Sequence, residues 1–298
     1  MKRPIFVGDV QGCADELAEL LARATDVFGE GFELWSVGDL VNRGPDNLGV
    51  LRQMRELVDA GRGQLVLGNH EINLLRVAAG QRPLGPYDSI ADVLEASDAD
   101  DWIDWLRRRP LVLSGELGRG RFAMVHAAVH PGWRLPELER RAQAAAARLA
   151  ASRRRDAERF LAGDRAGDPD LDVLHRLTAC RSVTRGGSWS SQLPELAGGA
   201  KYQPWHVAWS AQRHDYGVVY GHWALQGLHV GPGVRGLDTG CVHHGRGHDG
   251  FLTAWLPQLG ASDAFAVPDA AFWQVPARRA YYAQKDEPKK RAVGDVSD

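Results

Sequence analysis

The chain has 298 residues, of which 44% are hydrophobic and 25% are charged. These proportions are typical of a globular protein, and they exclude collagen-like, disulfide-scaffold and intrinsically disordered classes. Lysine and arginine number 36 against 38 aspartates and glutamates, which gives a formal net charge of −2. A protein that binds nucleic acid by neutralising phosphates usually has a basic excess, so we expect no dedicated DNA binding.

The ends of the chain and its cysteines indicate a cytoplasmic protein. Residues 1–9 contain no long apolar region, and no stretch elsewhere approaches the ~20 apolar residues that a membrane span requires. The three cysteines lie far apart, which favours reduced thiols over a disulfide framework. Residues 285–298 are polar or small, and we expect them to form a disordered tail.

Short apolar runs recur along the chain, and each has the length and the β-branched or aromatic content of a buried strand. They are residues 4–7, 32–37, 64–67, 121–125 and 217–221. Residues 14–21 and 47–54, which lie between the first three runs, have apolar side chains at helical spacing. This β-α-β-α-β order predicts a largely parallel sheet with crossover helices.

Two longer segments interrupt this rhythm. Residues 71–110 and 134–177 are expected to be helical inserts, and the second contains an Ala/Arg-rich stretch over 140–161. The arginines of that stretch could contact nucleic acid, but an exposed helix with solvated charges is the simpler interpretation. Residues 234–237 and 251–255 return to strand-like runs. We expect one α/β domain over residues 1–284.

A polar side chain that could bind a metal follows each of the first five apolar runs. These residues are Asp9, Asp39, Asn69, His126 and His222. In an open α/β sheet, ligands bind beyond the carboxyl ends of the strands, where the loops converge. Each residue alone could simply cap a helix or be an ordinary polar side chain. Five of them at the same topological position predict a metal site.

Oxygen and imidazole ligands without thiolates suit Mn²⁺, Mg²⁺, Fe or Zn²⁺. Two metals ~3.5–4 Å apart need a bridging carboxylate, and together they can clamp a phosphoryl group for in-line displacement. Asp39 lies between the other candidates in the sequence and is the natural bridge.

Three blocks of the sequence resemble the signature blocks of the phosphoprotein-phosphatase-like metallophosphoesterases. They are Gly8-Asp9-Val10-Gln11-Gly12, Gly38-Asp39-Leu40-Val41-Asn42-Arg43-Gly44 and Gly68-Asn69-His70-Glu71. Further stretches resemble one bacterial branch, the symmetrical bis(5′-nucleosyl)-tetraphosphatases. They are Cys13, Pro45-Asp46, Trp105-Leu106-Arg107 with Pro110, Val125-His126-Ala127, Tyr220-Gly221-His222-Trp223-Ala224 and Leu237-Asp238-Thr239-Gly240-Cys241. The resemblance implies a calcineurin-like sandwich of central β-sheets flanked by helices.

The resemblance also implies a role for each matching residue. Asp9 and Gln11 would bind one metal, Asp39 would bridge, and the second metal would be held by Asn69, His126 and His222. His70 looks like the general acid, and Arg43 looks like a phosphate clamp. A second phosphate-binding arginine would be Arg181 or Arg185, and Arg185 is the candidate we name.

Two positions depart from the family pattern. Residue 11 is usually histidine in such proteins, and Gln11 replaces an imidazole nitrogen with a harder amide oxygen. We expect a looser first metal that prefers Mn²⁺ or Mg²⁺, and the alternative is a first site that binds no metal. Residue 42 is usually aspartate in the protein phosphatases. Asn42 can still hold His70 by a hydrogen bond but cannot stabilise an imidazolium by charge.

The resemblance implies a hydrolase in which a metal-bridging hydroxide cleaves diadenosine tetraphosphate into two ADP. Its cofactors would be two divalent ions, with Mn²⁺ expected and Mg²⁺, Co²⁺, Fe or Zn²⁺ left open. A phosphoprotein phosphatase, or an enzyme acting on dinucleoside caps at RNA 5′ ends, would use the same site. A non-catalytic nucleotide-binding module is the distant alternative.

The loop with His243, His244 and His248 is expected to be exposed, because no strand fixes it.

Overall fold

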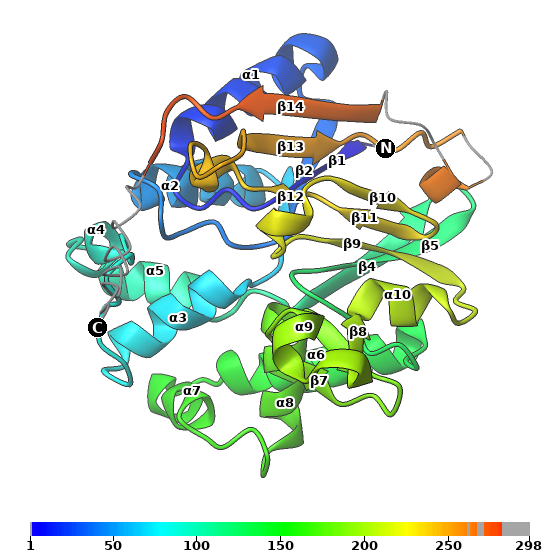
Figure 1. Cartoon of the computed structure of the whole chain (residues 1–298). Helices are drawn as coiled ribbons and strands as arrows, with labels where there is room; N and C mark the ends of the chain where they lie inside the picture. Colours follow the sequence, from blue (N-terminus) through cyan, green and yellow to red (C-terminus); the bar gives the residue numbers. More distant parts are fainter. Residues whose placement is uncertain (1, 261–262, 267–270, 282–298) are drawn as a thin grey trace, which may run out of the picture.

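The computed structural model describes residues 2–260, 263–266 and 271–281. Two β-sheets lie at its centre (Figure 1). The first has the order β12 (Asp238–Thr239), β13 (Phe251–Trp255), β1 (Arg3–Val7), β2 (Phe32–Ser36) and β3 (Gly63–Leu65), with β14 (Phe272–Pro276) also paired to β13. The second has the order β10 (His229–Gly231), β11 (Val234–Gly236), β9 (Tyr216–Tyr220), β5 (Gly120–Val125) and β4 (Val112–Leu117). The tail expected at 285–298 lies outside the described residues.

The first three strands pair in parallel, as the β-α-β-α-β pattern predicts. Their crossover helices are α1 (Ala14–Phe28) and α2 (Asn47–Asp59). Helix α2 begins where the Asp46 carboxylate accepts a hydrogen bond of 2.7 Å from the Gly49 amide, which satisfies one of the free N–H groups of the first turn.

The two sheets pack face to face through a second, smaller core of aromatic and aliphatic side chains. Side chains alternate along β1, so that Ile5 and Val7 belong to the larger core and Phe6 to the smaller one. The Phe6 ring lies 5.4 Å from Trp255 in its own sheet and 5.2 Å from Phe122 in the other sheet. This arrangement is a β-sandwich flanked by helices, the fold class that the resemblance implies.

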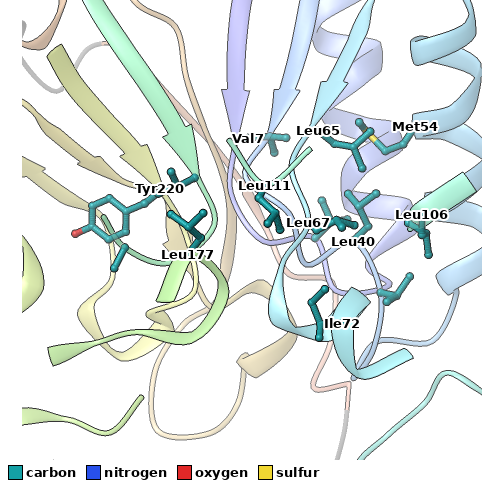
Figure 2. Packing of buried hydrophobic residues seen from close by; sticks show 14 of the residues in the cluster. Val7, Leu40, Met54, Leu65, Leu67, Ile72, Leu106, Leu111, Leu177 and Tyr220 are labelled. Carbon is teal, nitrogen blue, oxygen red and sulfur yellow. The ribbon is translucent and has the colours of Figure 1, made fainter. Parts of the chain in front are cut away.

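The larger core supports the loops that leave the strands. Figure 2 shows Val7 at the end of its strand, with Leu40 and Leu67 in the loops just beyond. All three side chains are fully buried, and Ile72 in the first turns of α3 (Asn69–Ala78) packs with them. Because buried apolar side chains anchor these loops, the polar residues beside them are held in fixed positions.

The segments expected to be helical inserts are largely helical. The first contains most of α3, then α4 (Ala91–Leu94) and α5 (Ala99–Leu106), and the second contains α6 (Leu135–Leu149), α7 (Arg154–Leu161) and α8 (Pro169–Ala179). The single exposed helix expected over 140–161 is wrong, because two helices are separated there at residues 150–153. Helix α6 buries one apolar face, and two of its arginines pair with acids, Arg141 with Glu137 at 2.9 Å and Arg148 with Asp168 at 3.1 Å.

Several elements are absent from the sequence-based prediction. They are β4, β10, β14, and a small third sheet of β7 (Trp189–Ser190), β6 (Ser182–Thr184) and β8 (Tyr202–Pro204), with the helices α9 (Pro194–Ala197) and α10 (Trp205–Ser210). Among the residues that the structure describes, the 3₁₀ turns include η1 (Gly199–Lys201), η2 (Ala224–Gln226), η3 (Cys241–His243) and η4 (Ala264–Ala266). Within the described ranges, none of the helices has the length and apolar character that crossing a membrane demands.

Candidate active site

The polar residues that follow the strands converge where the two sheets meet. Asp9, Asp39 and Asn69 follow strands of the first sheet, whereas His126 and His222 follow β5 and β9 of the second. Asp39, His126 and His222 each offer a ligand atom, and these atoms lie within 4.8 Å of one another. The single sheet edge expected from the sequence is therefore a junction of two sheets.

Each of the two histidines uses one ring nitrogen to bond a main-chain carbonyl. His126 Nδ1 lies 2.9 Å from the Val37 oxygen, and His222 Nε2 lies 3.2 Å from the Ala179 oxygen. A ring nitrogen that faces a carbonyl must carry the proton, so the other nitrogen keeps its lone pair. Metal-binding histidines are oriented in this way, because the second hydrogen bond fixes the tautomer.

Oxygen atoms surround the remaining nitrogen of His126. Its Nε2 lies 3.3 Å from Asp39 Oδ2 and 3.1 Å from Asn69 Oδ1. Burial lowers the pKa of His126, but the charge and hydrogen bond of Asp39, with Glu71 and the Val37 carbonyl, together raise it above its ordinary value. Burial would raise the pKa of Asp39, but the neighbouring His126 and His70 hold it well below its ordinary value.

Asp238 is a buried carboxylate at this junction to which the sequence analysis gave no role. Its charge acts on Asp9, whose pKa is raised well above its ordinary value by burial, then by Asp238 and Asp39. Burial also raises the pKa of Asp238 to about 6. Asp238 follows the apolar run 234–237, so the same strand-end rule that selected the other residues would have found it.

The donor set fits divalent cations. Asp9, Asp39 and Asp238 are each at most 4% exposed, and three carboxylates this close repel one another. Bound cations would offset that repulsion, and carboxylate, amide and imidazole donors suit Mn²⁺, Mg²⁺, Fe or Zn²⁺. Gln11 is buried in the wall of the same cavity, so its amide oxygen is available to a metal held by Asp9.

Backbone strain is concentrated in the same place. Within the described ranges, five non-glycine residues have a positive φ, and all five belong to the blocks singled out above: Gln11, Asp39, Asn42, Arg43 and His222. Such conformations cost of order 1–3 kcal/mol each and persist only where the surrounding structure imposes them. Gly68 allows the close approach that this site needs, because a Cβ there would lie 2.1 Å from Asp39 Oδ1.

Glu71 holds the loop that carries Asp39. Its two carboxylate oxygens accept hydrogen bonds of 2.7 to 3.2 Å from four buried backbone amides, those of Asp39, Leu40, Val41 and Gly68. Burial raises the pKa of Glu71 to about 7. Asp39 Oδ1 in turn accepts the His70 amide at 2.8 Å, so the second and third sequence blocks are tied together.

The His70 side chain is held by Asn42. The Asn42 oxygen accepts the amides of Arg43 and Ser89 at 2.9 Å each, so its NH₂ group faces the other way. That group donates to His70 Nδ1 at 2.8 Å and to Asp88 Oδ1 at 2.8 Å. Because Nδ1 accepts, the neutral ring carries its proton on Nε2, which lies 3.7 Å from Asp39 Oδ2. Burial lowers the pKa of His70, which favours this neutral form.

The arginines divide between the cavity and the surface. Arg43 lines the cavity, 3.7 Å from Asp88. Arg181 also lines it and donates to the main-chain oxygen of His222 at 3.1 Å. Burial lowers the pKa of Arg181, while Asp238, Asp39 and Asp9 act to raise it. Arg185, the candidate that we named, is exposed and does not line the cavity.

The cavity over the junction has a volume of about 770 Å³. Its polar lining includes Asp39, Asn69, His70 and His222, and its outer wall includes Leu196 and Leu225, which are 71% and 76% exposed. His243 and His248 also line it. The exposed loop expected at 243–248 is therefore wrong in part, because the buried start of η3 brings His243 to the cavity, where burial lowers its pKa to about 4.

The sandwich and its donor set define a metal-dependent phosphoesterase. A family model of calcineurin-like phosphoesterases matches residues 2–223. A protein from Shewanella sp. (strain MR-7), named symmetrical bis(5′-nucleosyl)-tetraphosphatase, is 39% identical over 264 residues that cover 84% of this chain and 93% of the relative. A protein of the same name from Burkholderia mallei (strain SAVP1) is 40% identical over 80% of this chain and 86% of the relative.

The chain belongs to the calcineurin-like phosphoesterases, and within them to the family of the symmetrical bis(5′-nucleosyl)-tetraphosphatases. Divalent metal ions are part of the chemistry of this family. Solved structures show the same fold. One is described as a candidate diadenosine tetraphosphatase, with a TM-score of 0.60 and 24% identity over 93% of this chain and 94% of that one. A serine/threonine phosphatase from Saccharomyces cerevisiae has a TM-score of 0.52 and 14% identity over 96% of this chain and 82% of that one.

Proposed function

We propose that this chain is a hydrolase that cleaves diadenosine tetraphosphate symmetrically into two ADP, with two divalent metal ions of which Mn²⁺ is the expected native metal. The observation that carries the proposal is the junction of the two sheets. There, Asp39 stands between two histidines whose other ring nitrogens are held by backbone carbonyls. We infer the substrate from the names of the relatives, and this chain aligns with nearly the whole length of each of them.

The residues divide between two metal positions. Asp9 and Gln11 would hold the first metal, Asn69, His126 and His222 would hold the second, and Asp39 would bridge them. Asp238, which acts with burial to raise the pKa of Asp9, adds a further carboxylate beside the first position. When bound, the metal ions lower the pKa of a water molecule and neutralise charge on the phosphoryl group.

His70 is the group that assists the leaving phosphate. Its ring is held by Asn42 with the proton on Nε2, so it can donate to a phosphate oxygen without first becoming an imidazolium. ADP is a good leaving group and needs less proton transfer than an alkoxide does. A neutral histidine held by an amide therefore suits anhydride cleavage better than phosphoserine hydrolysis.

The cavity can accommodate a polyphosphate between two nucleosides. Arg43 and Arg181 line it close to the metal-binding residues, and both can bind phosphate oxygens. Trp223, Leu196 and Leu225 form an apolar part of the wall. Planar bases bind to such surfaces by stacking and by apolar contact. We assign Arg181, rather than Arg185, to the phosphate.

The protein is proposed to act in the cytoplasm. All three cysteines are buried free thiols, which agrees with a reducing compartment. RNA 5′ caps share the dinucleoside polyphosphate chemistry and remain the nearest alternative substrate.

A comparison of substrates tests this function. With Mn²⁺, we expect kcat/KM for diadenosine tetraphosphate to exceed that for a phosphoserine peptide and for a dinucleoside-capped RNA by at least about 100-fold. The control is His70→Gln, which keeps the shape of the side chain and should lower kcat by roughly 10²–10⁴-fold. Equal rates on the phosphopeptide would contradict the proposal. Nucleotide binding without Mn²⁺-dependent turnover would favour the non-catalytic module.

A further inference from the structure

A second group of metal-binding side chains lies outside the proposed active site. Cys13, Glu16 and Cys241 each offer a ligand atom, and these atoms lie within 4.8 Å of one another. Cys13 and Glu16 are fully buried, and Cys241 is 1% exposed. These three residues do not line the active-site cavity.

The Glu16 carboxylate has an unused oxygen. Its Oε1 accepts the Arg278 amide at 2.8 Å and the Tyr281 hydroxyl. Its Oε2 is buried and has no hydrogen-bond partner among the residues that the structure describes. In the described part of the chain, Glu16 also makes no ion pair, because Arg278 pairs with Asp15 and Glu19 instead. Burying a carboxylate without a neighbouring cation costs free energy, so a cation bound beside Glu16 would stabilise the fold.

We propose that Cys13, Cys241 and Glu16 form a structural metal site that takes Zn²⁺. Two thiolates and a carboxylate are zinc ligands, and sulfur ligands distinguish this group from the nitrogen and oxygen donors of the active site. The fourth ligand would be a water molecule or the Tyr281 hydroxyl, which already donates a hydrogen bond to Glu16.

The site would tie together three segments that are distant in the sequence. Cys13 ends the loop that carries Asp9 and Gln11, and Cys241 follows the turn that carries Asp238. Glu16 adds the segment after β14 through Arg278 and Tyr281. A metal here would hold the Asp9 and Asp238 loops against each other without touching the substrate. The role of this metal site is structural, and its existence can be tested independently of the proposed reaction.

Cobalt substitution tests the site with a readout other than activity. The protein stripped by a chelator and reloaded with Co²⁺ should show a sulfur-to-cobalt charge-transfer band in the near ultraviolet, since the active site has no thiolate donor. Cys13→Ser and Cys241→Ser should abolish the band. Cys180→Ser is the matched control, because Cys180 is also buried, but its thiol donates to the Ser182 oxygen at 3.5 Å and it does not belong to the group of Cys13, Glu16 and Cys241. That variant should keep the band.

Elemental analysis gives the second measurement. The protein as purified should contain one more zinc per chain than Cys13→Ser. Glu16→Gln preserves the shape of the side chain and both thiols, so it serves if a cysteine variant does not fold; it should weaken Zn²⁺ binding by at least roughly 10-fold. A cobalt-loaded protein without the band, a band lost in Cys180→Ser, or a Cys13–Cys241 disulfide in the purified protein would overturn the proposal.

Discussion

At the scale of single residues, the side chain that holds His70 is an amide, Asn42, and not the carboxylate expected in the protein phosphatases. In a histidine–carboxylate pair the carboxylate accepts a proton from the ring, whereas here the Asn42 amide donates to it. The carboxylate of this network is Asp88, which lies behind Asn42 and also contacts Arg82 at 2.8 Å. The ring is therefore held in one tautomer without a carboxylate against Nδ1, and Asp39 is the carboxylate near its other nitrogen, 3.7 Å from Nε2.

This arrangement predicts the behaviour of two single variants and one double variant. Asn42→Ala should lower kcat by roughly 10-fold with little change in KM, which corresponds to the loss of about 1.4 kcal/mol of hydrogen bonding. Asn42→Asp should also lose activity, because its new carboxylate would face Asp88. Combining it with Asp88→Asn should restore part of kcat. Steady-state kinetics checks this, and a fully active Asn42→Asp single variant would show that the amide has no special role.

We expect the Gln11 side chain to affect the affinity for the first metal. Gln11→Ala should raise the Mn²⁺ concentration needed for half-maximal activity by at least about 10-fold, because an oxygen donor is lost. Gln11→His should instead tighten Zn²⁺ more than Mn²⁺, since imidazole suits Zn²⁺ better. Metal titrations of the two variants measure both effects. If Gln11→Ala binds two metals as tightly as the unaltered chain, Gln11 is not a ligand.

At the scale of elements, the first turn of α3 positions the loop after β2. The Glu71 carboxylate accepts four backbone amides of that turn and loop. Glu71→Ala should lower the free energy of unfolding by roughly 4 kcal/mol or more, because each buried amide left without a partner costs about 1–3 kcal/mol. Glu71→Gln keeps one oxygen and should lose less.

Urea unfolding measures the difference, with Glu95→Ala as the control because Glu95 is exposed on the surface. An unfolding free energy of Glu71→Ala that matches that of the control would refute this role.

The strand ends were predictable because they depend on local pattern. The apolar runs, each followed by Asp, Asn or His, located Asp9, Asp39, Asn69, His126 and His222, whereas Gln11 came from the family resemblance and Asp238 was not identified. Which sheet a strand joins was not predictable, because it depends on pairings such as Met124 with Val219, nearly a hundred residues apart. The short strands of the third sheet have too few residues for a periodic signal.

The two arginines illustrate the same limit. Arg181 and Arg185 stand at opposite ends of the three-residue strand β6, which the sequence did not reveal. Only the tertiary structure shows that Arg181 lies on the cavity and Arg185 on the surface.

At the scale of the whole molecule, a partly buried histidine, His175, makes stability depend on pH. The pKa of His175 is lowered to about 4 by burial and by the neighbouring Arg76 and Arg165. Between pH 6.5 and 4 the unfolded chain takes up a proton that the folded protein does not. His175 therefore reduces stability as the pH falls through this window, by at most about 1.4 kcal/mol per pH unit.

His175→Gln removes this contribution to the pH dependence of the free energy of unfolding. The free energy of unfolding of the unaltered protein, measured relative to the variant, should therefore fall between pH 7 and pH 5. Denaturant unfolding at the two pH values gives the comparison, and a difference that does not change with pH would contradict the assignment.

The central claim is that two metal positions at the junction of the sheets direct hydrolysis of the middle anhydride of a dinucleoside tetraphosphate. The most direct measurement is to incubate the protein with diadenosine tetraphosphate and Mn²⁺ and to separate the products by chromatography. We predict ADP as the sole nucleotide product, formed at two molecules per substrate and only when Mn²⁺ is present. Equal amounts of ATP and AMP, or no turnover, would contradict the account.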